Sequence, residues 1–234
     1  MYFQRCGKGT PILFLHGWGA DGNIFKAVAA SLPNNTCYLI DFVGFGQSEK
    51  PPMEGWSVLD YANDVVNFVE QQNLSQFTIV AHSFGCRVAM VLAAKWPNMV
   101  KRMLLVAPAG LRMPSLKRWL KLAKYKTHKF LCKLGLSQNV GARFGSVDYL
   151  ACENWLKNTF VKVVNQDLSK YARRIKCPTL IVNGNNDKDT PLKHAKRLQM
   201  LIKGSSLVEI DGDHFAFFRS PQAFAKTIHI FEES

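Results

Sequence analysis

The stretch that decides the fold, Phe77-Thr-Ile-Val-Ala-His-Ser-Phe-Gly-Cys-Arg-Val-Ala-Met90, changes character half way along. Its first four residues are apolar or β-branched, which is typical of a buried parallel strand, whereas residues 87–96 have the Ala and Leu spacing of a helix. Ser83 lies between the two, with Ala81 two residues before it and Gly85 two residues after it. Small neighbours relieve the crowding of a sharp strand-to-helix turn, so the pattern predicts an elbow that projects a nucleophilic hydroxyl at the carboxyl edge of a sheet. A Ser that only caps the helix after an ordinary turn would leave the same pattern.

The elbow belongs to a regular alternation of predicted strands and helices. Strands that alternate with helices at this spacing form βαβ units and a parallel sheet with right-handed crossovers. Besides the elbow strand, the predicted strands cover residues 2–5 at an edge, 11–15, 36–41, 101–107, 178–183 and 206–210, and the other predicted helices cover 24–32, 57–69, 191–202 and 221–231.

The alternation is interrupted once, between residues 111 and 174. This segment contains helical patterns but no convincing strand, and the alternation resumes at Cys177. We therefore expect one α/β core made of residues 1–110 and 175–234. Residues 111–174 would form an inserted helical cap over the carboxyl edge of the sheet.

The composition is that of one globular domain in a reducing compartment. The chain has 234 residues, 47% of them apolar, and shows neither a repeat nor a low-complexity segment. No signal peptide is apparent, and no apolar run approaches the roughly 18 residues that span a bilayer. The six cysteines have no CxxC spacing, so we expect free thiols, rather than disulfides or a zinc site, and a cytoplasmic protein.

A Ser hydroxyl is a weak nucleophile, so the elbow predicts a base and an orienting carboxylate elsewhere in the chain. In an open α/β sheet such groups gather at the carboxyl ends of strands. The predicted strand 178–183 runs into a turn that contains Asp187, and the predicted strand 206–210 runs into a loop that contains His214. The chain order Ser83, Asp187, His214 is the order in which nucleophile, acid and base follow one another after a nucleophile elbow.

With these motifs in order, the chain resembles the α/β-hydrolase superfamily over nearly its whole length. His16-Gly-Trp-Gly19 is similar to the family's His-Gly oxyanion loop, and Asp41 to Ser48 is similar to its Asp-x-x-Gly-x-Gly-x-Ser loop, with Val43 where Pro is usual. The run Gly184-x-x-Asp187-x-x-x-Pro191 resembles the acid turn, and Gly212-Asp-His214-Phe resembles the Gly-His-x motif with one inserted residue. The resemblance implies an α/β-hydrolase fold, with a mostly parallel sheet flanked by helices and an inserted helical cap.

The resemblance also implies a catalytic role for each motif. Ser83 would attack an acyl carbonyl, His214 would take its proton and deliver it to the leaving group, and Asp187 would hold the imidazole tautomer. The backbone N–H groups of Trp18 and Phe84 would form the oxyanion hole. Neither a metal ion nor an organic cofactor is required for this chemistry.

Other residues near the motifs receive supporting or structural roles. We expect Gly17, His82 and Phe215 to line the substrate pocket and His16 to hold its loop through a hydrogen bond. Asp189 competes with Asp187 for the acid role, but Asp187 holds the position in the turn that the family uses.

The predicted activity is hydrolysis of carboxylic esters or thioesters of small to medium acyl groups through an acyl-enzyme. A Ser at the elbow argues against the dehalogenases and epoxide hydrolases of this fold, which use Asp as the nucleophile. Carbon–carbon bond hydrolases and cofactor-free perhydrolases keep a Ser and stay open. A non-catalytic α/β-hydrolase that binds a ligand or partner is the alternative of another class, although such proteins usually lack one triad member.

The net charge of +13 is concentrated in one segment, because residues 111–176 hold fifteen Lys and Arg against three acidic residues. A basic cap would attract an anionic small substrate, an acidic acyl carrier protein or, through the amphipathic stretch 116–134, an anionic membrane surface. The His-Gly-Trp-Gly loop is also similar to that of the pimeloyl-carrier-protein methyl ester esterases, which implies an acidic carrier. A solvated charged face without a partner is the alternative, and no motif predicts nucleic-acid binding.

Overall fold

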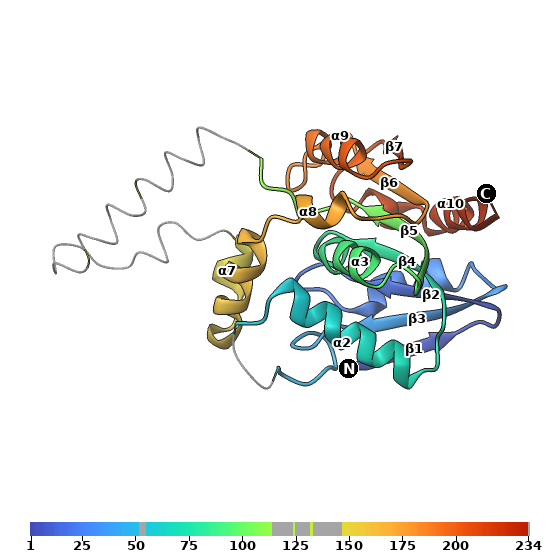
Figure 1. Ribbon diagram of the computed structural model, residues 1–234, viewed down its shortest axis with the longest axis horizontal. Coiled ribbons are helices and arrows are strands. Elements are labelled where there is room, and N and C mark those ends of the chain that lie inside the picture. Colours follow the sequence, from blue (N-terminus) through green and yellow to red (C-terminus); the bar gives the residue numbers. More distant parts are fainter. Residues whose placement is uncertain (52–54, 114–123, 125–131, 133–146, 234) are drawn as a thin grey trace.

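A sheet of seven strands forms the centre of the computed structural model, which describes residues 1–51, 55–113, 124, 132 and 147–233 (Figure 1). The strand order is β1-β3-β2-β4-β5-β6-β7; β1 pairs antiparallel with β3, and every other neighbouring pair is parallel. The strands are β1 (Tyr2–Cys6), β2 (Thr10–Leu15), β3 (Asn35–Asp41), β4 (Phe77–His82), β5 (Val100–Val106), β6 (Thr179–Gly184) and β7 (Ser206–Ile210). The prediction of a mostly parallel sheet with a short edge strand at the N-terminus is confirmed.

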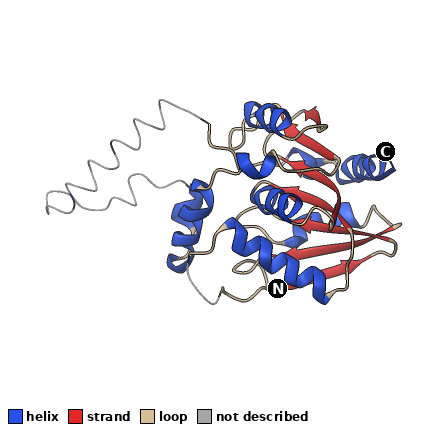
Figure 2. Cartoon of the chain, viewed as in Figure 1, coloured by secondary structure: helices blue, strands red, loops and turns tan. Residues whose placement is uncertain are grey.

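Helices cover both faces of this sheet (Figure 2). Successive residues of a strand point to opposite faces, so Leu13 and Leu15 join the core under one set of helices, whereas Ile12 and Phe14 join the core under the other set. The first set is α2 (Val58–Gln71), α3 (Phe84–Lys95) and α9 (Leu192–Leu201), and the second is α1 (Lys26–Ala29) and α10 (Pro221–Glu233). Burial on both faces explains why the central strands are apolar along their whole length.

The sequence predicts most of these elements to within a few residues, and the largest differences concern two helices. The elbow helix begins at Phe84, directly after Ser83, rather than at residue 87. The predicted helix 24–32 divides into a 3-10 turn at Gly22–Phe25 and the short α1, because Asp21 caps a tight first turn through the N–H of Asn23. Ser57 caps α2 as predicted, in a reciprocal capping box with Asp60.

The described part of the predicted cap is helical. It consists of α6 (Val147–Ala151), a 3-10 turn at Asn154–Leu156, α7 (Lys157–Asn165) and α8 (Ser169–Ala172). Its buried apolar residues join the same apolar cluster as α3; they are Cys152, Leu156, Phe160, Val163, Leu168 and Ala172. Most of residues 114–146 lie outside the described residues, so the division into core and cap stays a prediction.

Two further features of the chain concern its cysteines and the length of its helices. All six cysteines are free thiols. None of the helices in the described ranges has the length and apolarity that crossing a membrane would need.

Candidate active site

Ser83 lies at the sharp turn between β4 and α3, in a conformation that L-residues rarely adopt. Its φ is 49° and its ψ is −105°, and backbone strain of this kind collects at functional sites. Gly85 makes the turn sterically feasible, because a Cβ there would lie 2.2 Å from the carbonyl oxygen of Leu15 at the end of β2. The predicted elbow is therefore present, and the close approach of α3 to β2 requires a residue without a side chain at position 85.

The carboxylate of Asp187 is held in the turn after β6 by four hydrogen bonds. Its Oδ1 accepts the backbone N–H groups of Asp189 and Thr190, both at 2.8 Å. Its Oδ2 accepts the hydroxyl of Thr190 at 2.7 Å and Nδ1–H of His214 at 2.8 Å. A carboxylate has about four lone-pair sites, so this one is saturated.

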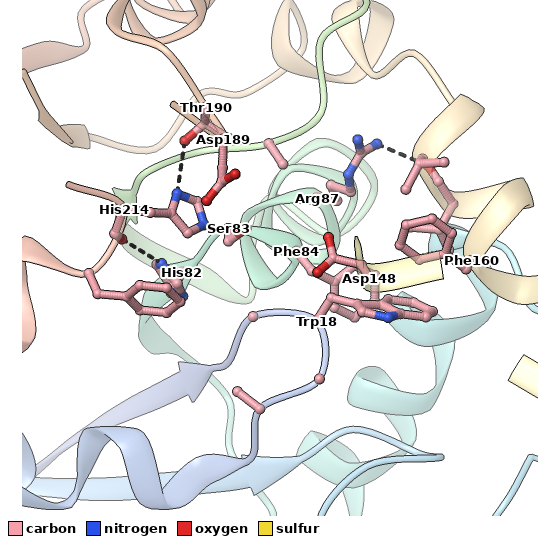
Figure 3. Close-up of a pocket in the computed structure, with 17 residues that line it drawn as sticks. Trp18, His82, Ser83, Phe84, Arg87, Asp148, Phe160, Asp189, Thr190 and His214 are labelled. Carbon is pink, nitrogen blue, oxygen red and sulfur yellow. Dashed lines mark hydrogen bonds between the residues drawn. The ribbon is translucent and has the colours of Figure 1, made fainter. Parts of the chain in front are cut away.

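His214, in the loop after β7, completes the arrangement. Its ring is largely buried, and Nδ1 faces Asp187. Figure 3 shows the ring between Thr190 and Ser83, so the second ring nitrogen is available to the serine. Asp189 is exposed and does not occupy the position next to Nδ1, which decides the competition for contact with His214 in favour of Asp187.

The hydrogen bonds from His214 and Thr190 keep Asp187 charged. Burial alone would raise the pKa of this carboxyl, but the hydrogen bonds from His214 and Thr190 and the charge interaction with the imidazole outweigh burial and hold the pKa below its ordinary value. Asp187 is thus ionised at neutral pH, which fixes the proton of the neutral imidazole on Nδ1.

Two further histidines lie near the elbow and are kept neutral by burial. Burial, together with a smaller effect of the nearby His214, lowers the pKa of His82 to about 3. Its Nε2–H donates to the backbone carbonyl of His214 at 3.1 Å, while its Nδ1 has no partner among the described residues. His16, whose pKa burial lowers to about 4, accepts the N–H of Phe42 and donates to the carbonyl of Gly17, so the predicted loop-holding hydrogen bond is present.

The candidate oxyanion-hole donors lie at the same edge of the sheet. Phe84 is the first residue of α3, so its N–H belongs to the first helical turn, which has no intrahelical partner and carries the positive end of the helix dipole. The N–H of Trp18 lies in the loop after β2. Neither amide donates to another group within the ranges that the structure describes.

A cleft of about 430 Å³ joins these groups. Ser83, His214, Trp18 and Phe84 line it, and so do all three predicted pocket residues, which are Gly17, His82 and Phe215. Asp187 lies behind His214. Several lining residues that the sequence does not predict come from α3, from the acid turn and from the helices of the predicted cap; they are Arg87, Thr190, Asp148, Phe160, Val163 and Val164.

Arg87 ties the elbow helix to the helix that closes one side of the cleft. It lies one turn after Ser83 on α3, and its Nη1 donates to the carbonyls of Val163 at 3.0 Å and Gln166 at 3.2 Å (Figure 3). These carbonyls belong to the C-terminal end of α7, where a cation also interacts favourably with the helix dipole. A basic residue four positions after the nucleophile, on the same face of the helix, was the available signal in the sequence.

One group of ligand-type side chains coincides with this site. One ligand atom each from Asp187, Asp189 and His214 lies within 4.8 Å of the other two. The four donors on Asp187 already occupy its lone pairs, and His214 Nδ1 donates to the same carboxylate, so a metal ion here would have to break the hydrogen bonds that position the imidazole.

Comparisons with known proteins agree with the fold. A family model described as alpha/beta hydrolase fold matches residues 10–131, and one described as TAP-like protein matches residues 138–231. The AB hydrolase superfamily protein YisY of Bacillus subtilis (strain 168) is 27% identical over 257 residues, which cover 100% of this chain and 96% of that protein.

Two solved structures share the fold at low sequence identity. The enol-lactonase from Burkholderia xenovorans LB400 has a TM-score of 0.77 and is 21% identical, with 100% of this chain and 96% of that chain covered. The esterase EaEST from Exiguobacterium antarcticum has a TM-score of 0.77 and is 21% identical, with 100% and 95% covered.

The sheet order, the strained elbow and the strand-end loops define the class of the protein as an α/β-fold hydrolase. With the family model matching more than half of the chain, the chain belongs to the α/β-hydrolase family, and it is a hydrolase.

Proposed function

We propose that the protein is a serine hydrolase that cleaves carboxylic esters or thioesters of small to medium acyl groups through an acyl-enzyme. The observation that carries the proposal is the convergence of three strand-end groups. Ser83 follows β4, Asp187 follows β6 and His214 follows β7, and a 2.8 Å hydrogen bond joins the last two.

The mechanism begins with proton transfer from the Ser83 hydroxyl to Nε2 of His214. The serine oxygen attacks the acyl carbonyl, while Asp187 stabilises the imidazolium through Nδ1–H. The N–H groups of Trp18 and Phe84 stabilise the oxyanion; losing one such donor typically costs about 10²–10³-fold in turnover. The imidazolium then protonates the leaving group, and a water activated by the same histidine releases the acyl group.

The dimensions and lining of the cleft support a small to medium acyl group. Its volume of about 430 Å³ is in the lower part of the usual range for ligand pockets. Phe160, Val163 and Val164 of α7, together with Trp18, give it an apolar side that suits an acyl chain. Among the proteins of similar structure, one is an esterase and one is an enol-lactonase, and both names describe action on an ester bond.

A fluorophosphonate probe tests the nucleophile. We expect the probe to label the wild-type protein and not Ser83→Ala, and we expect hydrolysis of p-nitrophenyl acetate to fall with the labelling. Ser31→Ala is the matched control, because Ser31 lies beside α1 and its hydroxyl donates to the backbone of Ala27. Absence of labelling in the wild type, or labelling that survives in Ser83→Ala, would refute the serine-hydrolase proposal in favour of a non-catalytic binding protein.

A substrate panel tests the bond that is cleaved. p-Nitrophenyl esters and acyl thioesters of graded length should be turned over, with a decline once the chain outgrows the cleft. A vinylogous 1,5-diketone and a perhydrolysis assay probe the carbon–carbon and peracid alternatives. If the diketone is cleaved or peracid is formed while all esters and thioesters are inert, the proposed ester hydrolysis is wrong and the same residues carry out that other reaction.

We further propose that a basic surface beside the cleft attracts anionic substrates, including acyl groups on an acidic carrier. The surface is formed by α8, the residues directly after α8 and α9; α8 and α9 contact each other (Figure 1), and α9 starts two residues after Thr190. Its exposed basic residues are Lys170, Arg173, Arg174, Lys176, Lys193, Lys196 and Arg197. Lys196 pairs with Glu209 at 3.0 Å.

Salt dependence tests this surface. Pull-down with an acidic acyl carrier protein should weaken from low to high salt and should weaken further in Arg173→Glu/Arg174→Glu, whereas Lys101→Glu at the far end of β5 should behave as wild type. Sedimentation with anionic vesicles in parallel distinguishes a membrane partner. Salt-insensitive behaviour in both assays would identify the charge as a solvated face.

A further inference from the structure

We propose that Thr190 is a positioning residue for the Asp187–His214 pair, and that its hydroxyl sets how strongly the carboxylate stabilises the protonated imidazole. This inference rests on the proposed function, in which His214 is the base. Thr190 takes no part in the catalytic steps proposed above.

The hydroxyl of Thr190 shares one carboxylate oxygen with the imidazole. Thr190 Oγ1 donates to Oδ2 of Asp187 at 2.7 Å, and His214 Nδ1–H donates to the same oxygen at 2.8 Å. The hydroxyl oxygen also lies 3.3 Å from Nδ1. Thr190 is largely buried at the edge of the cleft that it helps to line.

The backbone of Thr190 fixes the carboxylate at its other oxygen. Its N–H donates to Oδ1 of Asp187 at 2.8 Å, so this residue binds both carboxylate oxygens. Rotation of the carboxylate about its last bond would break both hydrogen bonds. The orientation of Oδ2 toward Nδ1 is therefore determined by Thr190 together with the amide of Asp189.

A second donor on Oδ2 also reduces the charge that this oxygen offers to the imidazole. A hydrogen bond to an ionised group is stronger than a neutral one, and it stabilises the carboxylate against accepting a proton. With the hydroxyl removed, Oδ2 would interact more strongly with Nδ1–H. The protonated imidazole, which is inactive as a base, would then persist to higher pH.

Other titratable groups face the pair, and they supply controls. His82 reaches it from β4, but with a pKa of about 3 it stays neutral across the working range. Asp189 lies in the same turn, with a carboxylate oxygen within 4.8 Å of ligand atoms of both residues, and His194 on α9 interacts with Asp187 through space. The negative charge of Asp189 favours the imidazolium, so Asp189→Asn should have the opposite effect from loss of the hydroxyl.

The kinetic test compares Thr190→Val, which keeps the shape, with Thr190→Ser, which keeps the hydroxyl. In Thr190→Val we expect kcat/KM for a p-nitrophenyl ester to fall roughly tenfold at the optimum, as loss of a hydrogen bond to a charged group predicts. We expect the acidic limb of the pH–rate profile of this variant, where activity rises with pH, to move to higher pH by about 0.5–1 unit. Thr190→Ser should restore both values, and Asp189→Asn should move the limb down by a smaller amount.

Proton NMR provides a readout that does not depend on turnover. In Thr190→Val the Nδ1–H resonance of His214 should move downfield, because the carboxylate oxygen becomes more basic, whereas in Thr190→Ser it should stay near the wild-type position. If the wild type hydrolyses no ester but the resonance responds as expected, the positioning role stands and the proposed function fails.

Two outcomes would overturn the role of Thr190. One is an acidic limb and a resonance that are unchanged in Thr190→Val. The other is an equal loss of rate in the Val and Ser variants without any shift of the limb, which would assign Thr190 to packing alone. Should Thr190→Val fail to fold, Thr190→Ala measured against Thr190→Ser decides by the same two readouts.

Discussion

The cleft has one wall built from the sheet and another built from α7, and the two are attached to the protein in different ways. The sheet wall carries Ser83, Asp187 and His214, each placed by the end of a buried strand. The α7 wall is nine residues long and is attached by side chains, through the packing of Phe160 and Val163 in the core and through hydrogen bonds that include two from Arg87. We therefore expect the chemistry to depend on the fold of the sheet and the acyl preference to depend on the side-chain contacts of α7.

Removal of the negative charge of Asp187, in the wall built from the sheet, should have the largest effect on activity. Asp187→Asn keeps the size of the side chain but removes the charge that holds the proton of His214 on Nδ1, so we expect kcat for ester hydrolysis to fall by about 10⁴-fold. Steady-state kinetics of the purified variant measure this. Asp189→Asn is the matched control and should lose at most a small factor; equal losses in the two variants would mean that the acid has been misassigned.

The same substitution should change the dependence of stability on pH. The pKa of Asp187 in the folded protein lies below the ordinary value of 3.8, so its contribution to the free energy of unfolding is complete above about pH 4 and is lost as the pH falls through the folded value. Urea unfolding at pH 6 and pH 3 should show a smaller drop in Asp187→Asn than in the wild type. An equal drop in the free energy of unfolding would show that the four hydrogen bonds to the Asp187 carboxylate do not stabilise the folded protein.

Gly85→Ala changes the elbow itself and should have the next largest effect on activity. The added Cβ would lie 2.2 Å from the carbonyl oxygen of Leu15, so α3 must move away from β2 and carry Ser83 with it. We expect roughly 100-fold lower activity and a lower melting temperature, since overpacking typically costs about 1–3 kcal/mol. Thermal unfolding and fluorophosphonate labelling measure the two effects. Ala81→Gly, which adds no atoms, should label normally, and normal labelling of Gly85→Ala would contradict the steric account.

Arg87→Met tests the α7 wall and should change specificity more than rate. Loss of two hydrogen bonds of about 0.5–1.5 kcal/mol each should loosen the C-terminal end of α7. We expect KM for the longer p-nitrophenyl esters to rise roughly tenfold, with kcat for the acetate nearly unchanged. Lys95→Met, at the other end of α3, should leave the profile of chain lengths as in the wild type. A uniform loss of kcat on every ester would show that the two walls are not independent.

The smallest predicted effect concerns His82, in the wall built from the sheet, and the dependence of the free energy of unfolding on pH. The pKa of His82 in the folded protein is about 3, well below the ordinary 6.5, so the unfolded chain binds the proton more tightly and stability falls as the pH drops below 6.5. One unit below that value the penalty is about 1.4 kcal/mol. His82→Asn should therefore lose less stability than the wild type between pH 7.5 and pH 5.5 in urea titrations. Parallel losses would place the titrating group elsewhere.

The two walls were also predictable from the sequence to different degrees. Ser83, Asp187 and His214 stand directly after apolar runs, so local patterns alone place them at one edge of the sheet. The residues of the α7 wall follow no such rule, because helical residues of an insertion can face the cleft or the solvent equally well. The sequence predicts only that Arg87 lies in a helix, because nothing in the neighbouring residues indicates which carbonyls it binds 76 and 79 residues later in the chain.

The sequence by itself determined the parallel α/β sheet, the elbow and the order of the three strand-end residues, because apolar runs, small residues at a turn and chain order are local properties. Only the tertiary structure decided that Asp187 rather than Asp189 meets His214, that Thr190 binds the same carboxylate oxygen, and that Arg87 holds α7. The physical reason is that most of these contacts join groups far apart in the chain: His214 lies 27 residues from Asp187, and Arg87 binds backbone carbonyls 76 and 79 residues away. Which of them come within hydrogen-bond distance depends on how strands and helices stack, and the spacing of residues along the chain does not contain that information.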